Sequence, residues 1–214
     1  MNKTNIAFFD FDGTISIKDT FIAFILFYTQ KHHKRLKLLF FCPYFFIMLL
    51  LYLAKIINNH QIKQKIMTVI LANTDQTQIQ QTATQFVNIK LNKYIKPKIL
   101  NLITKHQNQQ HQVIIVSANL EIFLNHWADK HNINKVIATK LEVTADKITG
   151  KILGQNCYGL EKVNRITDYL QANNLNWQQI YSYGYGDSAG DIHLLNQVDE
   201  GYWVYGDVIS KYKK

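Results

Sequence analysis

Short apolar runs that alternate with helix-like segments constrain the fold of this chain more than any other feature. Runs this brief, bounded by Asp, Gly or Asn, are too short for helices and predict buried strands. The predicted strands are Asn5–Phe9, Val113–Val116, Val136–Thr139, Ile180–Tyr183 and Gly201–Tyr205. Helical patterns lie over Lys98–Gln109, Leu120–His131 and Leu160–Ala172. This alternation predicts an α/β fold, a Rossmann-like parallel sheet flanked by helices with right-handed crossovers.

Two segments depart from the alternation. Residues 141–153 alternate in polarity around Gly150, which predicts a small antiparallel excursion from the sheet. Residues 19–94 read as consecutive helices with no strand among them, and we expect an all-helical cap inserted after the first strand. A chain of 214 residues suits one core with such an insertion. The predicted organisation is a core of residues 1–18 and 95–214 with a cap at 19–94.

Polar residues follow three of the predicted strands, at the edge where parallel α/β sheets place their active sites. The first strand leads into FFDFDGT, the second into IIVSAN and the fourth into GYGDSAGD, while a lysine stands at a helix start. The candidate site residues are Asp10, Asp12, Gly13, Thr14, Ser117, Asn119, Lys162, Asp187 and Asp191.

The carboxylates among these residues predict a magnesium site. Asp10, Asp12 and Asp187 would repel one another unless a hard cation lay between them. Mg²⁺ prefers oxygen ligands together with a bound phosphate. Asp191 stands four residues after Asp187, so it can orient that neighbour or a metal-bound water.

The remaining candidates predict a phosphate site beside the metal. A phosphate dianion needs positive charge and hydrogen-bond donors, which Lys162, Ser117, Asn119 and the backbone near Gly13 can supply. Gly13 also allows a close turn of the backbone, and we expect the Thr14 hydroxyl to steady that turn. The combined set predicts phosphoryl transfer.

Two carboxylates can divide this chemistry between them. Asp10 would attack phosphorus in line and form an acyl phosphate, while Asp12 would protonate the leaving alcohol and then activate the hydrolytic water. This division requires both side chains to face the same phosphate. The sequence therefore predicts a phosphomonoester hydrolase with an aspartyl-phosphate intermediate.

The order DFDGT after a strand, Ser after IIV, a helix-leading Lys and GDSxxD resembles the haloacid dehalogenase-like hydrolases. The helical insertion after the first motif resembles their subgroup typified by phosphoserine phosphatases. The resemblance implies the same roles for Asp10, Asp12, Ser117, Lys162 and Asp187, and it adds the backbone carbonyl of Asp12 as a metal ligand. Dehalogenases of this family lack the second Asp and the related ion pumps carry Thr there, so Asp12 implies phosphoester hydrolysis.

The cap gives weaker indications of the substrate. In phosphoserine phosphatases an acidic residue soon after the first motif meets the substrate amino group, and Asp19 matches it by position. An Arg of the cap should bind the serine carboxylate, which makes Arg35 the candidate. The chain has only one other arginine, Arg165, and neither stands in a context that matches this role. The resemblance therefore does not single out phosphoserine.

The apolar run of residues 38–54 follows the basic cluster KHHKRLK and allows three interpretations. It could be buried in the cap or in a homodimer interface, cross a membrane, or dip into one leaflet. A single crossing would separate Asp10 from Ser117, Lys162 and Asp187, which must lie on one side. We expect residues 21–57, including the apolar stretch 21–28, to contact an anionic membrane peripherally.

This expectation favours a lipid phosphate, such as phosphatidylglycerophosphate, as substrate. The chain resembles, more loosely, haloacid dehalogenase-type phosphatidylglycerophosphatases, which place a similar Pro-containing apolar stretch after the first motif. The alternatives are a phosphatase of a small metabolite, such as phosphoserine or a sugar phosphate, and an inactive membrane- or nucleic-acid-binding module. A net charge of +9 suits any anionic partner, but no aromatic-rich basic motif indicates nucleic acid.

The cysteine residues and the start of the sequence indicate the cellular compartment in which we expect the protein. Cys42 and Cys157 are far apart and form no zinc-like spacing, which suits a reducing environment. The first apolar run is short and is broken by Asp10 and Asp12, so it does not resemble a signal peptide. We expect a cytoplasmic protein that is peripheral on the membrane.

Overall fold

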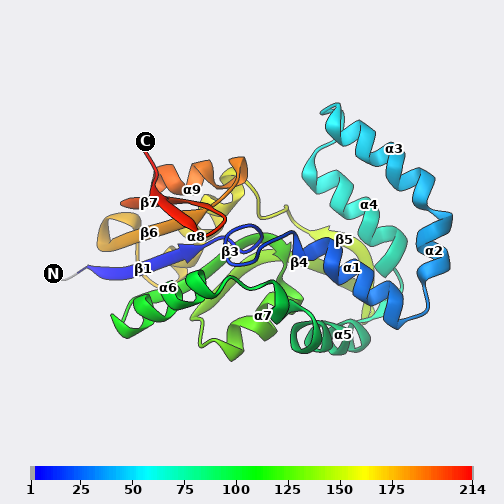
Figure 1. Ribbon diagram of the computed structural model, residues 1–214, viewed down its shortest axis with the longest axis horizontal. Coiled ribbons are helices and arrows are strands. Elements are labelled where there is room, and N and C mark those ends of the chain that lie inside the picture. Colours follow the sequence, from blue (N-terminus) through cyan, green and yellow to red (C-terminus); the bar gives the residue numbers. More distant parts are fainter. Residues whose placement is uncertain (1–2, 214) are drawn as a thin grey trace.

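An eight-stranded sheet forms the centre of the computed structural model, which describes residues 3–213 (Figure 1). The strand order is β2-β5-β4-β3-β1-β6-β7-β8. The strands are β1 Thr4–Phe9, β2 Thr74–Asp75, β3 Gln112–Leu120, β4 Lys135–Thr144, β5 Lys147–Leu153, β6 Ile180–Gly186, β7 Glu200–Tyr205 and β8 Val208–Lys211. The helices are α1 Thr20–Lys31, α2 Arg35–Phe40, α3 Cys42–Leu53, α4 Asn59–Leu71, α5 Gln76–Ile89, α6 Pro97–Asn108, α7 Glu121–Lys130, α8 Leu160–Ala172 and α9 Ile192–Gln197.

The predicted parallel α/β sheet is confirmed. Strand β1 lies between β3 and β6, with Phe8 beside Ile114 on one side and Gly184 on the other. Strands β4 and β7 extend the parallel set, and each of the five predicted strands is present. The expected antiparallel excursion is the β4–β5 hairpin, which turns at residues 145–146. The carboxyl ends of β1, β3 and β6 therefore meet at one edge.

Side chains of the central strands point alternately to the two faces of the sheet, and helices cover both faces. Ile6 and Phe8 of β1 point into a core with α8 and α9, whereas Ala7 and Phe9 point into the larger core that includes α6 and α7. Figure 1 shows these two helix pairs on opposite faces of the sheet. Strands buried on both faces have continuous apolar sequences, which is why these strands could be predicted from the sequence.

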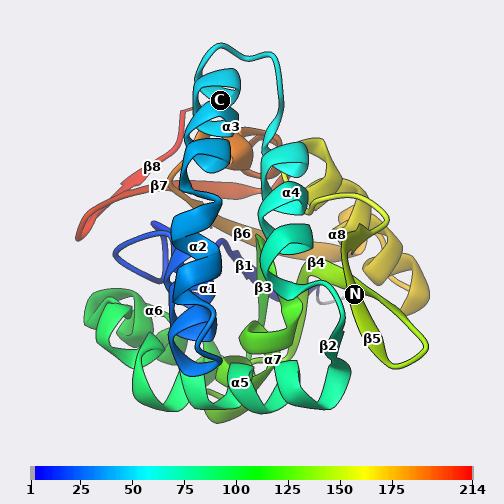
Figure 2. The same ribbon diagram turned by 90° about the vertical axis from the view of Figure 1, so that its right-hand side faces the viewer.

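Helices α1 to α5, which we call the cap helices, lie beyond the carboxyl end of β1 (Figures 1 and 2). The expectation of no strand in this segment was wrong, because β2 pairs antiparallel with β5. Two residues are too few for a periodic pattern, and the strand exists only through this pairing. Helix α4 also packs against β5, where Gly150 leaves room for the Thr68 backbone. The cap helices are thereby joined to the β4–β5 hairpin.

The structure divides the apolar stretches of this segment into buried and exposed parts. Phe21, Phe24, Ile25 and Tyr28 of α1 are buried in the larger core, whereas Ile22 and Leu26 are exposed. Contact of residues 21–28 with a membrane therefore stays a prediction. The run at 38–54 is broken at Phe41 into α2 and α3. Within residues 3–213, none of the helices is long and apolar enough to span a bilayer.

Candidate active site

Asp10 stands at the end of β1, where its backbone N–H donates to the Tyr185 carbonyl of β6 at 2.9 Å. Its side chain is buried, and Oδ1 accepts a hydrogen bond from Lys162 Nζ at 2.6 Å. Lys162 lies in the first turn of α8 and also donates to Asp191 Oδ1 at 2.6 Å. Burial raises the pKa of Asp10 well above its usual range, although Lys162 opposes that rise. Burial alone would lower the pKa of Lys162, but the two carboxylates outweigh it and raise that pKa.

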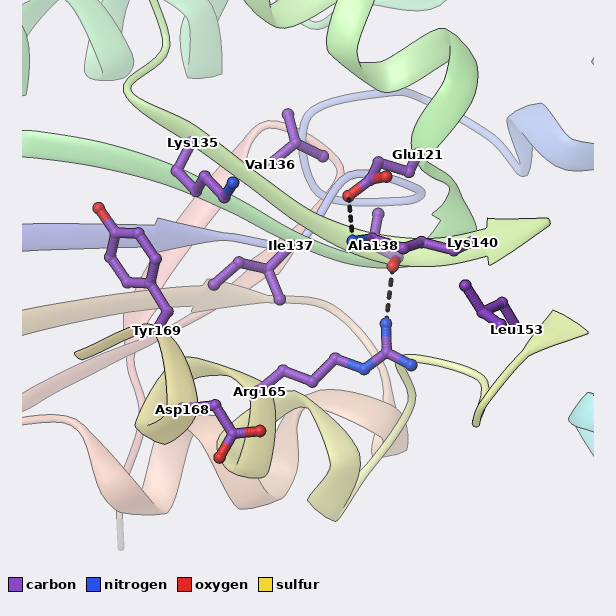
Figure 3. Close-up of a pocket in the computed structure, with 10 residues that line it drawn as sticks. All are labelled: Glu121, Lys135, Val136, Ile137, Ala138, Lys140, Leu153, Arg165, Asp168 and Tyr169. Carbon is purple, nitrogen blue, oxygen red and sulfur yellow. Dashed lines mark hydrogen bonds and ion pairs between the residues drawn. The ribbon is translucent and has the colours of Figure 1, made fainter. Parts of the chain in front are cut away.

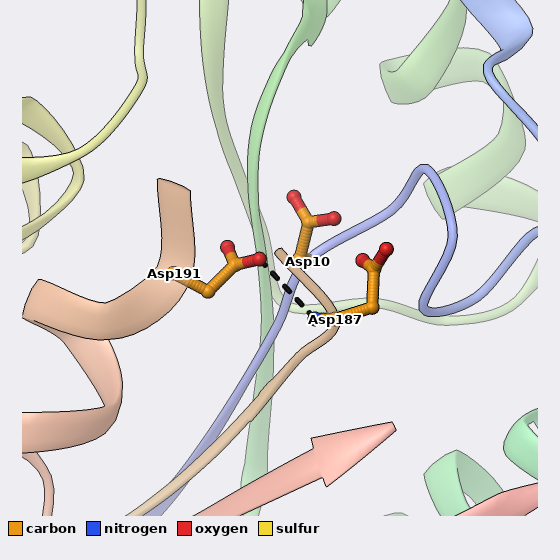
Figure 4. A group of neighbouring side chains, drawn as sticks. All are labelled: Asp10, Asp187 and Asp191. Atoms are coloured by element: carbon orange, nitrogen blue, oxygen red, sulfur yellow. Dashed lines mark hydrogen bonds between the residues drawn. The ribbon is translucent and has the colours of Figure 1, made fainter. Parts of the chain in front are cut away.

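Asp187 and Asp191 follow β6 and close the other side of the cluster (Figure 4). Asp191 Oδ2 accepts from the Asp187 backbone N–H at 3.2 Å and from the Ser188 hydroxyl at 2.8 Å. Burial would raise the pKa of Asp191, but the contacts with Lys162 and Ser188 hold it below its usual value. The predicted orienting contact between Asp191 and its neighbour is thus present as a hydrogen bond to the backbone.

The turn after β1 fits closely against Asp187. Thr14 is buried and donates from Oγ1 to Asp187 Oδ1 at 2.9 Å. Gly13 has φ of +82°, and a Cβ built there would lie 2.0 Å from Asp187 Oδ2. Only glycine fits both this conformation and this space. The sequence therefore places a glycine where the backbone must pass the carboxylate.

The donor set fits a hard divalent cation. Oxygen atoms of Asp10, Asp187 and Asp191 lie within 4.8 Å of one another, and among the described residues Lys162 forms ion pairs with Asp10 and Asp191 but not with Asp187. Burial raises the pKa of Asp187, although Thr14, Lys162 and Lys96 oppose that rise. Both Asp191 oxygens already accept hydrogen bonds, whereas Asp10 Oδ2 accepts none among the described residues. Asp10 and Asp187 are therefore the side chains best placed to hold Mg²⁺.

The Asp12 side chain is not part of this three-carboxylate cluster and is held by its own hydrogen bonds. Its Oδ1 accepts from the Thr20 backbone N–H at 2.9 Å and from the Thr20 hydroxyl at 2.6 Å. Its Oδ2 accepts from Asn119 Nδ2 at 2.7 Å. Burial, with a smaller contribution from Asp19, raises the pKa of Asp12 to about 6. A carboxyl group with this pKa can carry a proton near neutrality, as a general acid must.

The residues predicted to bind phosphate lie around this cluster with different contacts. Ser117 is buried at the end of β3, and its Oγ accepts from the Asn119 backbone N–H at 3.1 Å. The Asn119 amide holds Asp12 and the Thr20 hydroxyl. Phosphate binding by Ser117 and Asn119 stays a prediction. The structure adds to it a positioning contact from Asn119 to Asp12.

Two buried lysines beside the site were missed by sequence reasoning. Lys63 of α4 donates to the Ala118 carbonyl at 3.0 Å, and Lys96 donates to the Gly13 carbonyl. Lys63 lies on the same stripe of α4 as the buried Met67 and Ile70. A lysine on an otherwise apolar stripe was the available signal. Lys96 precedes Pro97 and carried no comparable signal.

The residues expected to recognise substrate from the cap are engaged elsewhere. Asp19 is exposed and caps α1, accepting from the Phe21 and Ile22 backbone N–H groups at 2.8 and 3.2 Å. The structure does not bring Arg35 to the cluster, because Arg35 begins α2, which lies at the end of the molecule far from the carboxyl end of β1 (Figure 1). An amino-group contact by Asp19 stays a prediction.

Arg165 lies on α8, one turn after Lys162, and is held against β4. It donates to Glu161 Oε1 at 2.8 Å and to the Ala138 carbonyl at 2.8 Å. Figure 3 shows it in a pocket with Glu121 and Lys140, whose charged atoms lie 3.8 Å apart. None of the candidate site residues lines this pocket. Arg165 thus fastens α8 to β4 and does not reach Asp10.

Comparisons with known proteins agree with this arrangement. A model of the haloacid dehalogenase-like hydrolases matches residues 7–196. Protein CicA of Caulobacter vibrioides is 25% identical over 199 residues, which cover 92% of this chain and 85% of CicA.

Solved structures share the fold. A protein of unknown function from Bordetella pertussis Tohama I has a TM-score of 0.81 at 20% identity, covering 94% of this chain and 89% of that one. A substrate-bound phosphoserine phosphatase complex has a TM-score of 0.61 at 16% identity, covering 94% and 86%. At these identities the likeness establishes a common architecture.

Proposed function

This chain belongs to the haloacid dehalogenase-like hydrolases, and we propose that it hydrolyses phosphomonoesters through an aspartyl-phosphate formed on Asp10. The observation that carries the proposal is the difference in hydrogen bonding between the two oxygens of the Asp10 carboxylate. Lys162 holds Oδ1 at 2.6 Å, while Oδ2 accepts no hydrogen bond from the described residues. One oxygen is thus fixed and the other is available to attack phosphorus.

The first half of the reaction uses Asp10 and Asp12 together. Asp10 Oδ2 forms a bond to phosphorus as the bond between phosphorus and the leaving oxygen breaks. The departing alkoxide takes the proton of Asp12 and leaves as the neutral alcohol. Thr20 and Asn119 fix the Asp12 carboxyl from both sides for this transfer. The products of this half are the free alcohol and an acyl phosphate on Asp10.

In the second half Asp12, now ionised, removes a proton from water. The oxygen of that water attacks the phosphorus, the acyl phosphate bond breaks, and the Asp10 carboxylate is restored with release of phosphate. Lys162 stays beside Asp10 throughout and offsets the charge on the transferred group. Ser117 and the backbone near Gly13 would donate to the phosphate oxygens.

Asp10 and Asp187 would hold the Mg²⁺, with the Asp12 backbone carbonyl as a further ligand implied by family resemblance. When bound, the ion neutralises the carboxylates and the phosphate oxygens. Thr14 and Gly13 keep Asp187 at its position beside this site. Asp191 acts through its hydrogen bonds to Lys162 and to the backbone of Asp187.

For the substrate class we propose a lipid phosphomonoester such as phosphatidylglycerophosphate. The support is the apolar surface of α2 and α3, where Phe40 is 80% exposed and Phe46 60% exposed. These helices belong to the cap helices beside the site (Figure 2). An apolar surface there suits an enzyme whose substrate stays in a membrane.

A second candidate is a soluble phosphorylated metabolite such as phosphoserine, and Lys63 favours any substrate, soluble or lipid, that carries a second anionic group. Lys63 is buried, and among the described residues no carboxylate oxygen lies within 4.0 Å of its Nζ, so it forms no ion pair there. A buried ammonium with one hydrogen bond suits a ligand that brings a second anionic group. Phosphoserine and phosphatidylglycerophosphate both carry one beside the phosphomonoester, whereas phosphatidate does not.

Magnesium-dependent phosphate release tests the proposed reaction. Phosphatidylglycerophosphate, phosphatidate and phosphoserine would be compared side by side with wild-type protein and Asp10→Asn. We expect hydrolysis that requires Mg²⁺ and is abolished by Asp10→Asn, with Asp129→Asn, an exposed carboxylate on α7, as the matched control. Activity that survives Asp10→Asn would contradict the proposal.

A further inference from the structure

Helices α2 and α3 expose an apolar surface that nothing in residues 3–213 covers. α3 has no buried side chain, although Phe45 packs in part against the larger core. The remaining faces of the two helices carry large apolar side chains with between 50% and 80% of their surface exposed. They are Leu36, Leu39, Phe40, Phe46, Ile47, Leu50 and Leu53. We call this the α2–α3 surface.

The charge of the surrounding segment has one sign. No Asp or Glu occurs between Asp19 and Asp75, whereas seven Lys or Arg residues do. They are Lys31, Lys34, Arg35, Lys37, Lys55, Lys63 and Lys65. The first four stand at or before the start of the apolar surface, and Lys55 stands directly after it. The α2–α3 surface is therefore flanked by cations at both ends.

We infer that the α2–α3 surface docks onto an anionic lipid bilayer, with α3 lying in the plane of the headgroups. The apolar side chains would enter the boundary between headgroups and acyl chains, and the flanking cations would bind lipid phosphates. At 1.5 Å per residue, the 12 residues of α3 extend about 18 Å, too short to cross the hydrocarbon core. Docking in the plane is the geometry that this length permits.

Charge also decides against a second copy of the chain as the occupant. Two α2–α3 surfaces brought face to face would place the basic cluster of each copy, which contains Arg35 and Lys37, against a segment whose charged residues are all Lys or Arg. Neither cluster would find a carboxylate in the opposing segment. An anionic bilayer buries the same apolar side chains and neutralises the same cations.

The docked surface lies close to the site. Tyr52, in the last turn of α3, adds to the rise in the pKa of Tyr158 that burial causes. The Tyr158 ring packs so tightly on Gly190, between Asp187 and Asp191, that a Cβ there would lie 2.3 Å from the ring. The end of α3 and the carboxylate cluster thus share a neighbour. The inference rests on the proposed function only in naming a membrane as the source of its lipid substrate.

Vesicle flotation tests the inference without catalysis. Asp10→Asn protein would be mixed with vesicles of phosphatidylcholine alone or of phosphatidylcholine with phosphatidylglycerol. We expect flotation with the phosphatidylglycerol vesicles and little with phosphatidylcholine alone. Phe46→Gln with Leu50→Gln should weaken binding about tenfold or more, and so should Arg35→Gln with Lys37→Gln.

Matched controls carry the same substitutions elsewhere on the surface. Ile89→Gln with Leu153→Gln changes two side chains that are each 54% exposed, and Lys93→Gln with Lys98→Gln removes two exposed cations. Both controls should float like the parent protein, and circular dichroism would show that every variant is folded.

Three results would overturn the inference: no flotation, equal flotation with both kinds of vesicle, or a stable dimer that Phe46→Gln with Leu50→Gln dissociates. Hydrolysis of a soluble substrate by wild-type protein, measured separately, reports on the proposed function. A negative flotation result would therefore overturn the membrane inference without affecting the proposed phosphatase activity. A negative hydrolysis result would do the reverse.

Discussion

Lys162 Nζ lies 2.6 Å from Asp10 Oδ1, although 152 residues separate the two in the sequence. Both residues are almost fully buried, with 2% of Lys162 and 6% of Asp10 exposed. The contact joins the end of β1 to the start of α8 across the sheet edge. It fixes one oxygen of the proposed nucleophile and supplies the positive charge that a transferred phosphate needs.

Lys162→Met should reduce phosphate release by about a hundredfold or more, because it removes the cation that faces the transferred group. The substitution also leaves the buried Asp10 and Asp191 without a counterion, so we expect the free energy of unfolding to fall by about 3 kcal/mol. Steady-state kinetics and urea unfolding measure the two effects. Lys98→Met, at an exposed position of α6, is the control and should change neither.

Thr20→Val should lower kcat about tenfold with little effect on KM. The valine keeps the shape of the side chain and the backbone N–H contact but removes the 2.6 Å hydroxyl bond to Asp12 Oδ1. Asp12 would then be less precisely held for proton transfer. Thr104→Val removes a hydroxyl that bonds only to a carbonyl of its own helix, and it should leave kcat unchanged. A kcat of wild-type size in Thr20→Val would show that this hydroxyl does not position Asp12.

Gly13→Ala should abolish activity and weaken the response to Mg²⁺. The new Cβ would lie 2.0 Å from Asp187 Oδ2, so Asp187 must move away from Asp10. Gly154→Ala provides the matched control, because Gly154 also has a positive φ, +74°, but has no atom within 4 Å of a built Cβ. Backbone strain alone should cost Gly154→Ala about 1 kcal/mol and no activity. Equal losses of activity in the two variants would contradict the proposed crowding at Asp187.

The free energy of unfolding should fall as the pH drops from about 6.5 toward 4, in part because of His106. Burial lowers the pKa of His106 to about 4 in the folded chain, where its Nε2 lies 2.9 Å from the Tyr185 hydroxyl. In this window the unfolded chain binds a proton that the folded chain does not. Stability therefore rises with pH, and between about pH 7 and pH 5 the contribution of His106 is about 2 kcal/mol.

His106→Gln tests the assignment of this pH dependence. Glutamine does not titrate and can still bond to the Tyr185 hydroxyl, so the variant should lose less stability than wild type between the two pH values. Urea unfolding at both pH values measures the difference. An identical loss in both proteins would assign the dependence to other groups.

The core of the fold and most of the candidate site could be predicted from the sequence. Strands buried on both faces leave unbroken apolar runs, and parallel strands bring their carboxyl ends to one edge. The positions of Asp10 and Asp187 follow from those two rules, whereas Lys162 stands at a helix start and was assigned to the site because a phosphate needs positive charge. Their mutual contacts are a consequence of topology that each motif alone does not indicate.

The cap helices could not be predicted to the same depth. Whether an apolar helix is buried depends on what packs against it, and the sequences of α1 and α3 are both apolar while only α1 is covered. The contact of Lys63 with the core depends likewise on how α4 sits over β3. Such tertiary arrangements leave no periodic signal in the chain.

The central claim is that Asp10 carries the phosphoryl group, and trapping the acyl phosphate tests it most directly. Asp12→Asn protein, in which water activation is slowed, would be mixed with Mg²⁺ and an aryl phosphate whose leaving group needs no protonation, quenched in acid and reduced with borohydride, which converts an aspartyl phosphate to homoserine. Peptide mass spectrometry should find homoserine at residue 10 and at none of the other aspartates. Homoserine at another position, or its absence from a variant that still turns over, would contradict the account.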